Sequence, residues 1–166
     1  MNCLANISVN NSSNGDLILR RFEVKDQDQV VRLIDHVCAE SDWMATKRFT
    51  PTPSWLHAFS EPTCAFHLLL IAESDSNIVG WCRLFPEKCK YVDVVELGIG
   101  ILSDYRHKTL GSSFIGAMFA WARNVGAKRI ELSVHVDNHI AVYLFKKFNF
   151  EVVSTNSEFF LMSANV

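Results

Sequence analysis

The residues that could bind a phosphate-bearing ligand lie between 96 and 122, where an apolar run ends, a short polar loop follows and an amphipathic segment begins. We predict a strand, a loop and a helix in that order. The first amides of a helix lack backbone acceptors and lie at the positive end of its dipole, so a tight loop there can bind a pyrophosphate. Gly111 and Ser112 are small enough for such contact, and Arg106 and Lys108 add positive charge. Taken alone, this pattern is equally typical of an ordinary capped helix.

A second segment, residues 138–150 with the sequence NHIAVYLFKKFNF, favours the phosphate-binding interpretation over an ordinary capped helix. Together the two segments resemble the GNAT superfamily of N-acetyltransferases. The family's cofactor motif, Arg/Gln-x-x-Gly-x-Gly/Ala, lies on Arg106, Thr109 and Gly111. Its next block, Asn-x-x-Ala-x-x-Leu-Tyr-x-Lys-x-Gly-Phe, lies on Asn138, Ala141, Leu144, Phe145, Lys147, Asn149 and Phe150. The resemblance extends more faintly from about Leu17 to Met162, and two motifs in the expected order are more specific than either alone.

The resemblance implies acetyl-CoA as the acyl donor, bound in a wedge between strand 91–102 and strand 130–136. The pantetheine arm would bond backbone groups near Ile99 and Ile101, and a backbone N–H near Ile99 would stabilise the oxyanion. Backbone N–H groups from His107 to Ser112 would hold the pyrophosphate. The candidate cofactor-binding residues are Ile99, Gly100, Ile101, Arg106, His107, Lys108, Thr109, Leu110, Gly111, Ser112, Asn138, Ala141 and Phe145. For Asn138, a role as a helix N-cap alone remains the alternative.

Two departures from the family pattern fall at backbone turns. Thr109 stands where the family usually has Gly, and a β-branched residue there is tolerable if φ is negative but costly if φ is positive. In the costly case, CoA would bind more weakly or the loop would be arranged differently. Asn149 replaces a Gly at a helix C-terminus, and we expect this change to be nearly neutral because Asn is the next best residue for left-handed backbone.

Phe145 is the third departure, since many family members have a Tyr here that protonates the departing CoA thiolate. Tyr143 is close in sequence, but two residues correspond to about 200° around a helix, so we expect its hydroxyl to point elsewhere. Thiolate is a fairly good leaving group, with a thiol pKa near roughly 8.5. Water or another side chain could therefore protonate it, and catalysis could continue at a lower rate.

Two side chains are candidates for the general base that accepts a proton from the attacking amine. Glu96 precedes two Gly residues in an otherwise apolar strand, and similar family members often carry a Glu near this point. A Glu on the solvent face, or paired with a neighbouring Lys, is an equally good interpretation. His135 is the second candidate, although isolated His residues are more often structural. Asp93 and His107 are weaker candidates.

The acceptor pocket is expected beside the irregular stretch after the first helix, which commonly walls it in this fold. Glu40 and Trp43 are the candidate substrate-binding residues, because a carboxylate and an aromatic ring suit a cationic amine. The alternative, which we favour for the aromatic residues, is that Trp43 and Phe49 pack under the loop. No Cys lies near the expected thioester position, which argues for direct transfer rather than an acetyl-enzyme intermediate.

Hydrophobic periodicity and turn residues predict the elements around this site. Asp26, with Gln29 as its capping-box partner, is the expected N-cap of the first helix, and Gly126 is the expected left-handed residue after the third. Two Gly in one strand suggest a bulge or a close backbone approach. The expected strands cover 17–23, 67–73, 78–85, 91–102, 130–136, 150–155 and 158–163, and the expected helices 27–40, 55–59, 110–125 and 139–148.

This order of elements predicts one α/β (α+β) domain over residues 16–166, after a flexible N-terminal tail at 1–15. The resemblance implies a mixed, mostly antiparallel sheet of six to seven strands, splayed between the fourth and fifth strands and flanked by about four helices. We expect a monomer or a homodimer.

Composition excludes several classes of protein. The 166 residues carry a net charge of −2 with no concentrated basic face, which argues against a nucleic-acid partner. The five Cys, at 3, 38, 64, 82 and 89, fit neither a disulfide framework nor a zinc site, so we expect free thiols and no metal. We see no signal peptide and no apolar run long enough to span a membrane, and expect a soluble cytoplasmic protein with no membrane partner.

Three functional hypotheses remain. The first is an acetyl-CoA-dependent N-acetyltransferase that acts on a primary amine by direct attack in a ternary complex. The second is a non-catalytic acyl-CoA-binding sensor or regulatory module, which Phe145 and Thr109 keep open. The third, a domain for another phosphate ligand such as a nucleotide, is weak because the chain lacks the glycine-rich nucleotide motifs.

Overall fold

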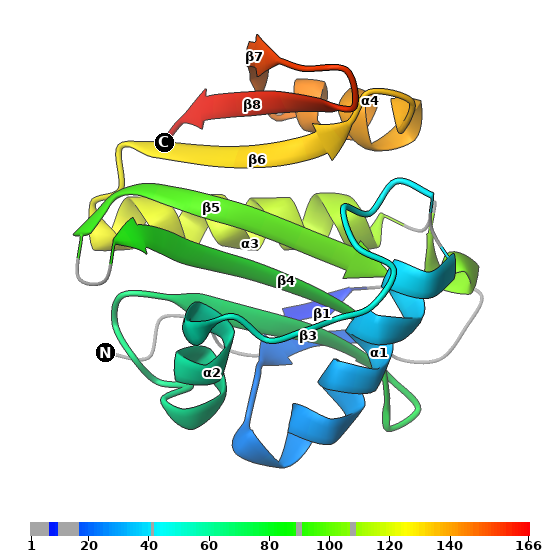
Figure 1. Ribbon diagram of the computed structural model, residues 1–166. Helices are drawn as coiled ribbons and strands as arrows, with labels where there is room; N and C mark the ends of the chain where they lie inside the picture. The colour runs from blue at the N-terminus through cyan, green and yellow to red at the C-terminus, as the bar shows by residue number, and fades with distance from the viewer. Residues whose placement is uncertain (1–6, 10–16, 41, 89–90, 107–108) are drawn as a thin grey trace.

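The computed structural model describes residues 7–9, 17–40, 42–88, 91–106 and 109–166 (Figure 1). The described strands are β1 (Ile7–Val9), β2 (Leu17–Arg21), β3 (Leu68–Ser74), β4 (Asn77–Lys88), β5 (Tyr91–Ile101), β6 (Arg129–His135), β7 (Glu151–Thr155) and β8 (Phe159–Asn165). The described helices are α1 (Gln27–Glu40), α2 (Pro53–Ser60), α3 (Leu110–Val125) and α4 (His139–Lys147), with 3-10 turns at Val24–Asp26 and Ser103–Tyr105. None of these helices is both long and apolar enough to cross a membrane.

The strands form one mixed sheet in the order β1-β2-β3-β4-β5-β6-β8-β7. Every neighbouring pair is antiparallel except β5 and β6, which are parallel and are joined through α3. This confirms the expected fold class, with one more strand than expected. The extra strand is β1, which pairs with β2 and lies within the stretch that we assigned to a tail. The rest of that stretch, 1–6 and 10–15, lies outside the described residues.

Helices cover both faces of the sheet: α3 lies behind it in Figure 1, while α1 and α2 lie in front. Alternate side chains of each strand point to opposite faces, so each strand contributes to two cores. In β3, Leu68 and Leu70 join the core under α3, whereas Leu69 and Ile71 join the core under α1 and α2. The two cores fix the sheet between the helical layers and hold the ends of β5 and α3 in place.

The sheet separates where β5 meets β6. Pairing between these two strands covers Val94–Glu96 and Arg129–Glu131 and ends there, although both strands continue and are fully described. Beyond Glu96, β5 remains paired with β4 on its other edge as far as Ile101. We call the space between the diverging ends of β5 and β6 the wedge. The expected splay between these two strands is therefore confirmed.

Two local expectations about the first helix are wrong. Asp26 was expected to cap α1 with Gln29 as its partner, but the capping box lies one turn earlier, between Glu23 and Asp26. The Asp26 carboxylate is buried because it also binds Arg20 at 2.7 Å. Gln29 instead accepts a hydrogen bond from the backbone N–H of Ile78. A buried ion pair with a residue on β2 has taken precedence over the local helix-capping pattern.

The two glycines of β5 are neither at a bulge nor under another backbone. A Cβ at Gly98 would lie 2.8 Å from Nε of Arg83, and one at Gly100 would lie 2.6 Å from Nε1 of Trp81. Side chains of β4 therefore cross over β5 at these positions, and the register of β4 and β5 is regular here. Glycine is required because the face of β5 toward α1 and α2 is occupied by these two long side chains.

Candidate functional site

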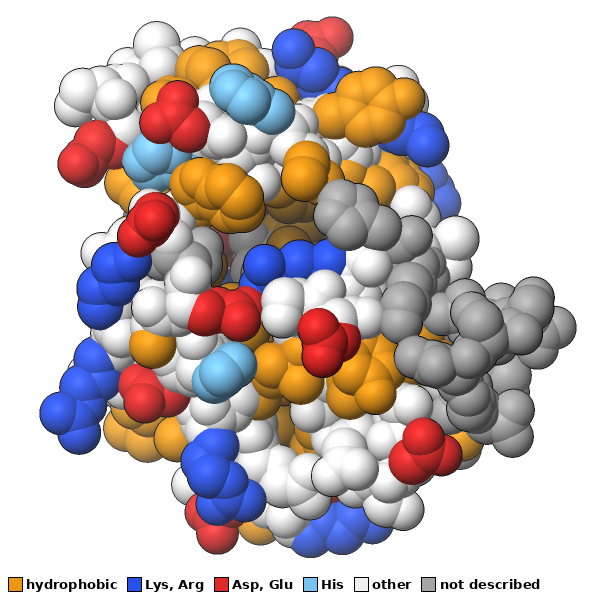
Figure 2. Space-filling model, turned by 90° about the vertical axis from the view of Figure 1, so that its right-hand side faces the viewer, with side chains coloured by type: hydrophobic (Ala, Val, Ile, Leu, Met, Phe, Trp, Pro, Cys, Tyr) orange, Lys and Arg blue, Asp and Glu red, His pale blue; other side chains and the backbone are white. Residues whose placement is uncertain are grey.

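A cavity of about 520 Å³ lies at the open end of the wedge, and Figure 2 shows a hollow in this face with hydrophobic side chains around it. Its walls come from four parts of the chain that are distant in sequence. They are the end of α1 and the segment after it, the end of β5, the start of α3, and α4. The lining residues are Val37, Trp43, Met44, Ile99, Gly100, Ile101, Arg106, Thr109, Gly111, Ser112, Asn138, Ile140, Ala141, Tyr143, Leu144, Phe145 and Lys147.

The structure brings most of the expected cofactor residues to this one cavity. Ten of them line it: Ile99, Gly100, Ile101, Arg106, Thr109, Gly111, Ser112, Asn138, Ala141 and Phe145. The Leu110 side chain is in the core instead, so only its backbone is available to a ligand. His107 and Lys108 lie outside the described residues.

The first turn of α3 lies at the cavity, which Gly111 and Ser112 line. The first bond of this turn runs from the N–H of Ser113 to the carbonyl of Thr109, so the N–H groups of 110–112 have no acceptor within the helix. A Cβ at Gly111 would lie 2.9 Å from Cδ2 of Leu144, so glycine also allows α4 to pack closely against α3. These amides and the helix dipole make the turn suitable for an anion such as a pyrophosphate.

Thr109 has a left-handed backbone, with φ at 63°. This is the costly case named above, because a β-branched side chain is strained at positive φ. Asn149 also has positive φ, at 62°, which agrees with its expected role as a tolerated substitute for glycine. The strain at Thr109 lies directly at the anion-binding turn, whereas Asn149 ends α4 away from the cavity lining.

Arg106 links the turn to two other elements. Its Nε donates a hydrogen bond to the carbonyl of Ile101 at 2.8 Å, and its Nη2 forms an ion pair with the carboxylate of Glu40 at the end of α1. The other oxygen of Glu40 lies 3.5 Å from Nε2 of His36. Glu40, expected to bind the acceptor amine, is therefore already paired with a cation. Its position favours a role in orienting Arg106.

The residues of α4 divide between a buried side and a cavity side. Asn138 caps the helix, since its Oδ1 accepts from the N–H of Ala141 at 3.2 Å, and it also lines the cavity. Phe145 is 5% exposed and packs against Phe150, so it presents only an apolar ring to the cavity. Tyr143, expected to point elsewhere, lines the same cavity from its exposed rim, with the ammonium of Lys147 5.7 Å from its ring centre.

Trp43 and Phe49 have different environments. Trp43 is 37% exposed and lines the cavity. Phe49 packs edge-on against Trp55, with ring centres 5.3 Å apart, and belongs to the core under α1 and α2. The packing interpretation therefore holds for Phe49.

Glu96 lies at the closed end of the wedge, not in the large cavity. A smaller hollow of about 110 Å³ there is lined by Val94, Glu96, Glu131, Leu132, Ser133 and Leu161. The Glu96 carboxylate is 2.5 Å from Nη2 of Arg83, whose guanidinium stacks over Phe85 at 4.7 Å. Because Glu96 and Glu131 are the last paired residues of β5 and β6, two carboxylates line this hollow. Both carboxylates are ion-paired, Glu96 with Arg83 and Glu131 with Arg129 at 2.8 Å, and the Glu96 side chain is 60% exposed.

His135 has the contacts of a structural residue. Its Nδ1 accepts a hydrogen bond from the N–H of Asp137 at 3.2 Å, and its ring packs edge-on against Phe159. It lines neither the large cavity nor the smaller hollow. These contacts match the alternative given for it in the sequence analysis. Asp93 pairs with Lys128 on the exposed surface.

Sequence reasoning missed several cavity residues. Four of them, Ile140, Tyr143, Leu144 and Lys147, recur at helical spacing on α4. Two of these are large apolar residues on the exposed surface: Ile140 is 58% exposed and Tyr143 is 67% exposed. Their recurrence at helical spacing was the signal available in the sequence. Glu131, Val37 and Met44 had no such signal, because their positions depend on packing between distant segments.

A model of the acetyltransferase (GNAT) family matches residues 32–150 of the chain. The match begins within α1, includes both motif segments and ends just after α4. It covers all of the wedge-forming part of β5 and β6.

Two curated relatives are similar in sequence. The chain is 29% identical over 118 residues to a candidate ribosomal protein bS18-alanine N-acetyltransferase of Bacillus subtilis (strain 168), covering 71% of this chain and 74% of that one. It is 29% identical over 94 residues to an L-amino acid N-acetyltransferase of Escherichia coli (strain K12), covering 55% and 58%.

Solved structures share the fold. A GNAT-family acetyltransferase of Streptococcus pneumoniae superposes with a TM-score of 0.79 at 22% identity, covering 90% of this chain and 99% of that one. The candidate acetyltransferase yncA of Salmonella typhimurium, solved with acetyl-CoA, superposes with a TM-score of 0.74 at 14% identity, covering 90% and 93%. These likenesses show a common architecture.

Proposed function

The chain belongs to the acetyltransferase (GNAT) family, whose acyl donor is acetyl-CoA, and from this premise we propose that it acetylates a primary amine by direct attack in a ternary complex. The observation that carries this proposal is the 520 Å³ cavity, which joins an anion-binding helix start to an unpaired strand edge. A pyrophosphate and a pantetheine arm require these two features side by side.

The donor is held by backbone groups at both ends of its chain. The amides of 110–112, which have no acceptor within α3, and the guanidinium of Arg106 bind the diphosphate. The edge of β5 from Ile99 to Ile101 has no β6 partner, so its outward N–H and C=O groups bond the pantetheine amides. Apolar residues of α4, among them Ala141 and Phe145, cover the arm from the other side. A backbone N–H near Ile99 stabilises negative charge on the thioester oxygen.

The amine approaches from the closed end of the wedge. Glu96, which lines the smaller hollow, accepts the proton that the amine must lose before it attacks the thioester carbon. Arg83 fixes the Glu96 carboxylate at one oxygen and leaves the other oxygen able to act. No role is given to His135 because its side chain is engaged with Asp137 and Phe159.

The departing thiolate meets an apolar ring at Phe145 rather than a proton donor. With a thiol pKa near roughly 8.5, the thiolate can leave without immediate protonation and take its proton from water. Catalysis then continues at a rate below that of an enzyme with a hydroxyl at this position.

We propose an α-amine as the acceptor. The names of the two relatives refer to an N-terminal alanine and to free L-amino acids, and both acceptors present an α-ammonium.

Steady-state thiol release with acetyl-CoA and a panel of amines tests the function. The panel contains free L-amino acids, peptides beginning with Ala, the same peptides with a blocked N-terminus, and polyamines. We expect turnover with unblocked α-amines and none with blocked peptides. Acetyl-CoA binding without turnover on any amine would contradict the proposal and favour a non-catalytic acyl-CoA-binding module.

A substitution at Glu96 tests the mechanism. We expect Glu96→Gln to lower kcat by about 100-fold, within the range of general-base catalysis, and to leave the KM for acetyl-CoA unchanged. His135→Gln is the matched control and should retain kcat near that of the wild type. A large loss in His135→Gln with little loss in Glu96→Gln would reverse the assignment of the base.

A further inference from the structure

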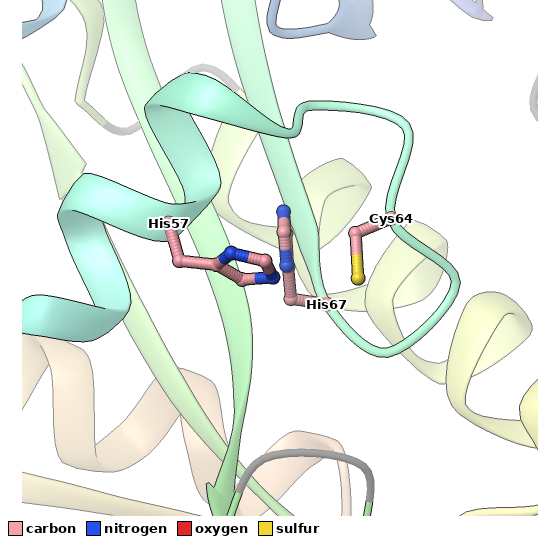
Figure 3. A group of neighbouring side chains, drawn as sticks. All are labelled: His57, Cys64 and His67. Carbon is pink, nitrogen blue, oxygen red and sulfur yellow. The ribbon is translucent and has the colours of Figure 1, made fainter.

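Three potential metal ligands meet on the side of the molecule away from the wedge. His57 lies on α2, Cys64 lies in the loop after it, and His67 immediately precedes β3. Each offers one ligand atom, and these atoms all lie within 4.8 Å of one another. Figure 3 shows the His67 ring standing between the His57 ring and the Cys64 sulfur. None of the three residues lines the large cavity or the smaller hollow.

His67 is the buried member of the cluster and has unused binding capacity. Its side chain is 3% exposed, and its Nε2 has no hydrogen-bond partner among the described residues. A buried ring nitrogen without a partner is costly, so its presence calls for a ligand.

The backbone around the cluster is held in place. Arg21 donates to the carbonyl of Cys64 at 3.3 Å and to the carbonyl of His67 at 3.1 Å. The N–H of Glu61 bonds the carbonyl of His57, and the N–H of Cys64 bonds the carbonyl of Glu61. The three candidate ligands thus belong to one hydrogen-bonded loop, which lowers the entropy cost of gathering them around an ion.

We propose that His57, Cys64 and His67 bind a single zinc ion, with water as the fourth ligand. A set of two imidazoles and one thiolate suits zinc, which is borderline soft and takes nitrogen and sulfur ligands. Zinc bonds of about 2.1 Å to nitrogen and about 2.3 Å to sulfur place tetrahedral ligand atoms about 3.4–3.6 Å apart. The ligand atoms here lie within 4.8 Å of one another, so binding requires the exposed His57 and the half-buried Cys64 to turn toward one ring nitrogen of His67.

The proposed ion has a structural role. It would join α2 to the start of β3, and Trp55 and Phe59 of α2 are part of the core under α1 and α2. We expected no metal because the spacing of the five Cys fits no zinc site. The positive charge of Arg21 nearby opposes the ion, so we expect binding weaker than in a site with four protein ligands.

Titration of the full chain with Co²⁺, after treatment with a chelator, tests the site directly. The background variant Cys3→Ser/Cys89→Ser removes two thiols that lie outside the described residues. Cys38 and Cys82 are buried and remain. We expect one Co²⁺ per chain, with thiolate-to-metal charge transfer and the visible absorption of tetrahedral cobalt. Adding Zn²⁺ should displace the cobalt and remove both signals.

Single substitutions identify the ligands. Cys64→Ser should remove the charge-transfer band. His57→Ala should weaken Co²⁺ binding at least about 100-fold, because losing a residue that only hydrogen-bonds to a metal ligand already weakens metal binding about 10–100-fold. Because His57 is exposed, we expect His57→Ala to fold, and it tests the site even if His67→Ala fails to fold. His139→Ala, an exposed His on α4, is the matched control and should bind as the background does.

Thermal unfolding gives a second readout that is independent of catalysis. Zn²⁺ should raise the Tm of the background protein and leave that of His57→Ala unchanged. Failure to bind Co²⁺ stoichiometrically, a charge-transfer band that persists in Cys64→Ser, or an equal Tm increase in His57→Ala would each overturn the proposal. Because no step requires acetyl-CoA, these outcomes leave the acetyltransferase proposal untouched.

Discussion

Arg106 and Glu40, 66 residues apart in the chain, form an ion pair that joins the end of α1 to the loop before α3. The same guanidinium donates to the carbonyl of Ile101, the last residue of β5. One side chain therefore ties together three of the four segments that line the large cavity. The arrangement fixes the anion-binding turn relative to the unpaired edge of β5.

Arg106→Ala should raise the KM for acetyl-CoA by at least about tenfold, equivalent to about 1.4 kcal/mol, with a smaller effect on the KM for the amine. The variant loses both the charge near the diphosphate and the contacts that orient the turn. Arg106→Lys should restore the KM for acetyl-CoA only in part, because an ammonium cannot bond the Ile101 carbonyl and the Glu40 carboxylate at once as the planar guanidinium does. Steady-state kinetics with acetyl-CoA varied at saturating amine measures the change.

The matched variant is Glu40→Gln, which keeps a neutral acceptor for Arg106. We expect its KM for acetyl-CoA to rise about threefold, since a charge-assisted bond becomes a neutral one. If Glu40 bound the acceptor amine instead, this variant would raise the KM for the amine and leave that for acetyl-CoA unchanged.

Thr109→Gly should stabilise the protein by roughly 0.5–1 kcal/mol, because it relieves a left-handed β-branched residue at a small cost in chain entropy. We also expect a lower KM for acetyl-CoA, since the turn at the start of α3 becomes easier to adopt. Urea unfolding and steady-state kinetics provide the two measurements. Thr109→Ala keeps the Cβ strain and should give less than half of the gain.

Asn149→Gly is the positional control for this prediction. Asn149 has nearly the same φ as Thr109, at 62° against 63°, but Asn tolerates this backbone. Its substitution should therefore change stability little. An equal gain at both positions would show that strain at Thr109 is not the cause.

Phe145→Tyr should raise kcat by about tenfold without changing the KM for acetyl-CoA. A tyrosine hydroxyl at this ring can protonate the departing thiolate, which Phe145 cannot do. Pre-steady-state thiol release separates this step from product dissociation. Phe145→Leu, which removes the ring packing against Phe150 but adds no hydroxyl, should not raise kcat. A kcat in Phe145→Tyr no higher than that of the wild type would mean that thiolate protonation does not limit the rate.

Asp26→Asn should destabilise the protein at pH 7 by about 2–3 kcal/mol. Breaking a fully buried ion pair typically costs about 3–5 kcal/mol. The cost here is smaller because Arg20 keeps Glu73 as a partner. Burial opposes ionisation of Asp26, but hydrogen bonds from Arg20 and from the N–H of Glu23 outweigh it. The pKa of Asp26 therefore lies below its ordinary value of 3.8.

The pH dependence of the Asp26 effect follows from the sign of this shift. A carboxylate whose pKa is lower in the folded state stabilises the protein above its unfolded pKa and loses that contribution as pH falls through the folded pKa. The difference in unfolding free energy between wild type and Asp26→Asn should be constant from pH 5 to 7 and shrink below about pH 4. A difference that instead grew as the pH fell would contradict this assignment.

Much of the fold was predictable because its signals are local. The turn between β3 and β4, the left-handed Gly126 after α3 and the Asn138 cap of α4 each depend on a few consecutive residues. The same holds for the helix start at Gly111 and Ser112, which is why most of the expected cofactor residues line one cavity. The backbone preferences and hydrogen bonds of a short segment are largely fixed by its own side chains.

Apart from β1, a strand within the stretch expected to be a tail, the expectations that failed concern which residues are partners. Asp26 was expected to cap α1 but is buried against Arg20 of β2. The two glycines of β5 proved to accommodate side chains of β4. Each outcome depends on which strand or helix lies alongside, and that is a property of the packed sheet.

By itself, the sequence determined the order of the helices and strands, the anion-binding start of α3 and the family resemblance. The tertiary structure decided which distant side chains meet: Arg106 with Glu40, Glu96 with Arg83, and His57 with Cys64 and His67. The physical reason is the distance along the chain over which the deciding interactions act. Local conformation is set by neighbours along the chain, whereas ion pairs, cavities and ligand clusters form only after the hydrophobic cores have fixed the relative positions of the elements.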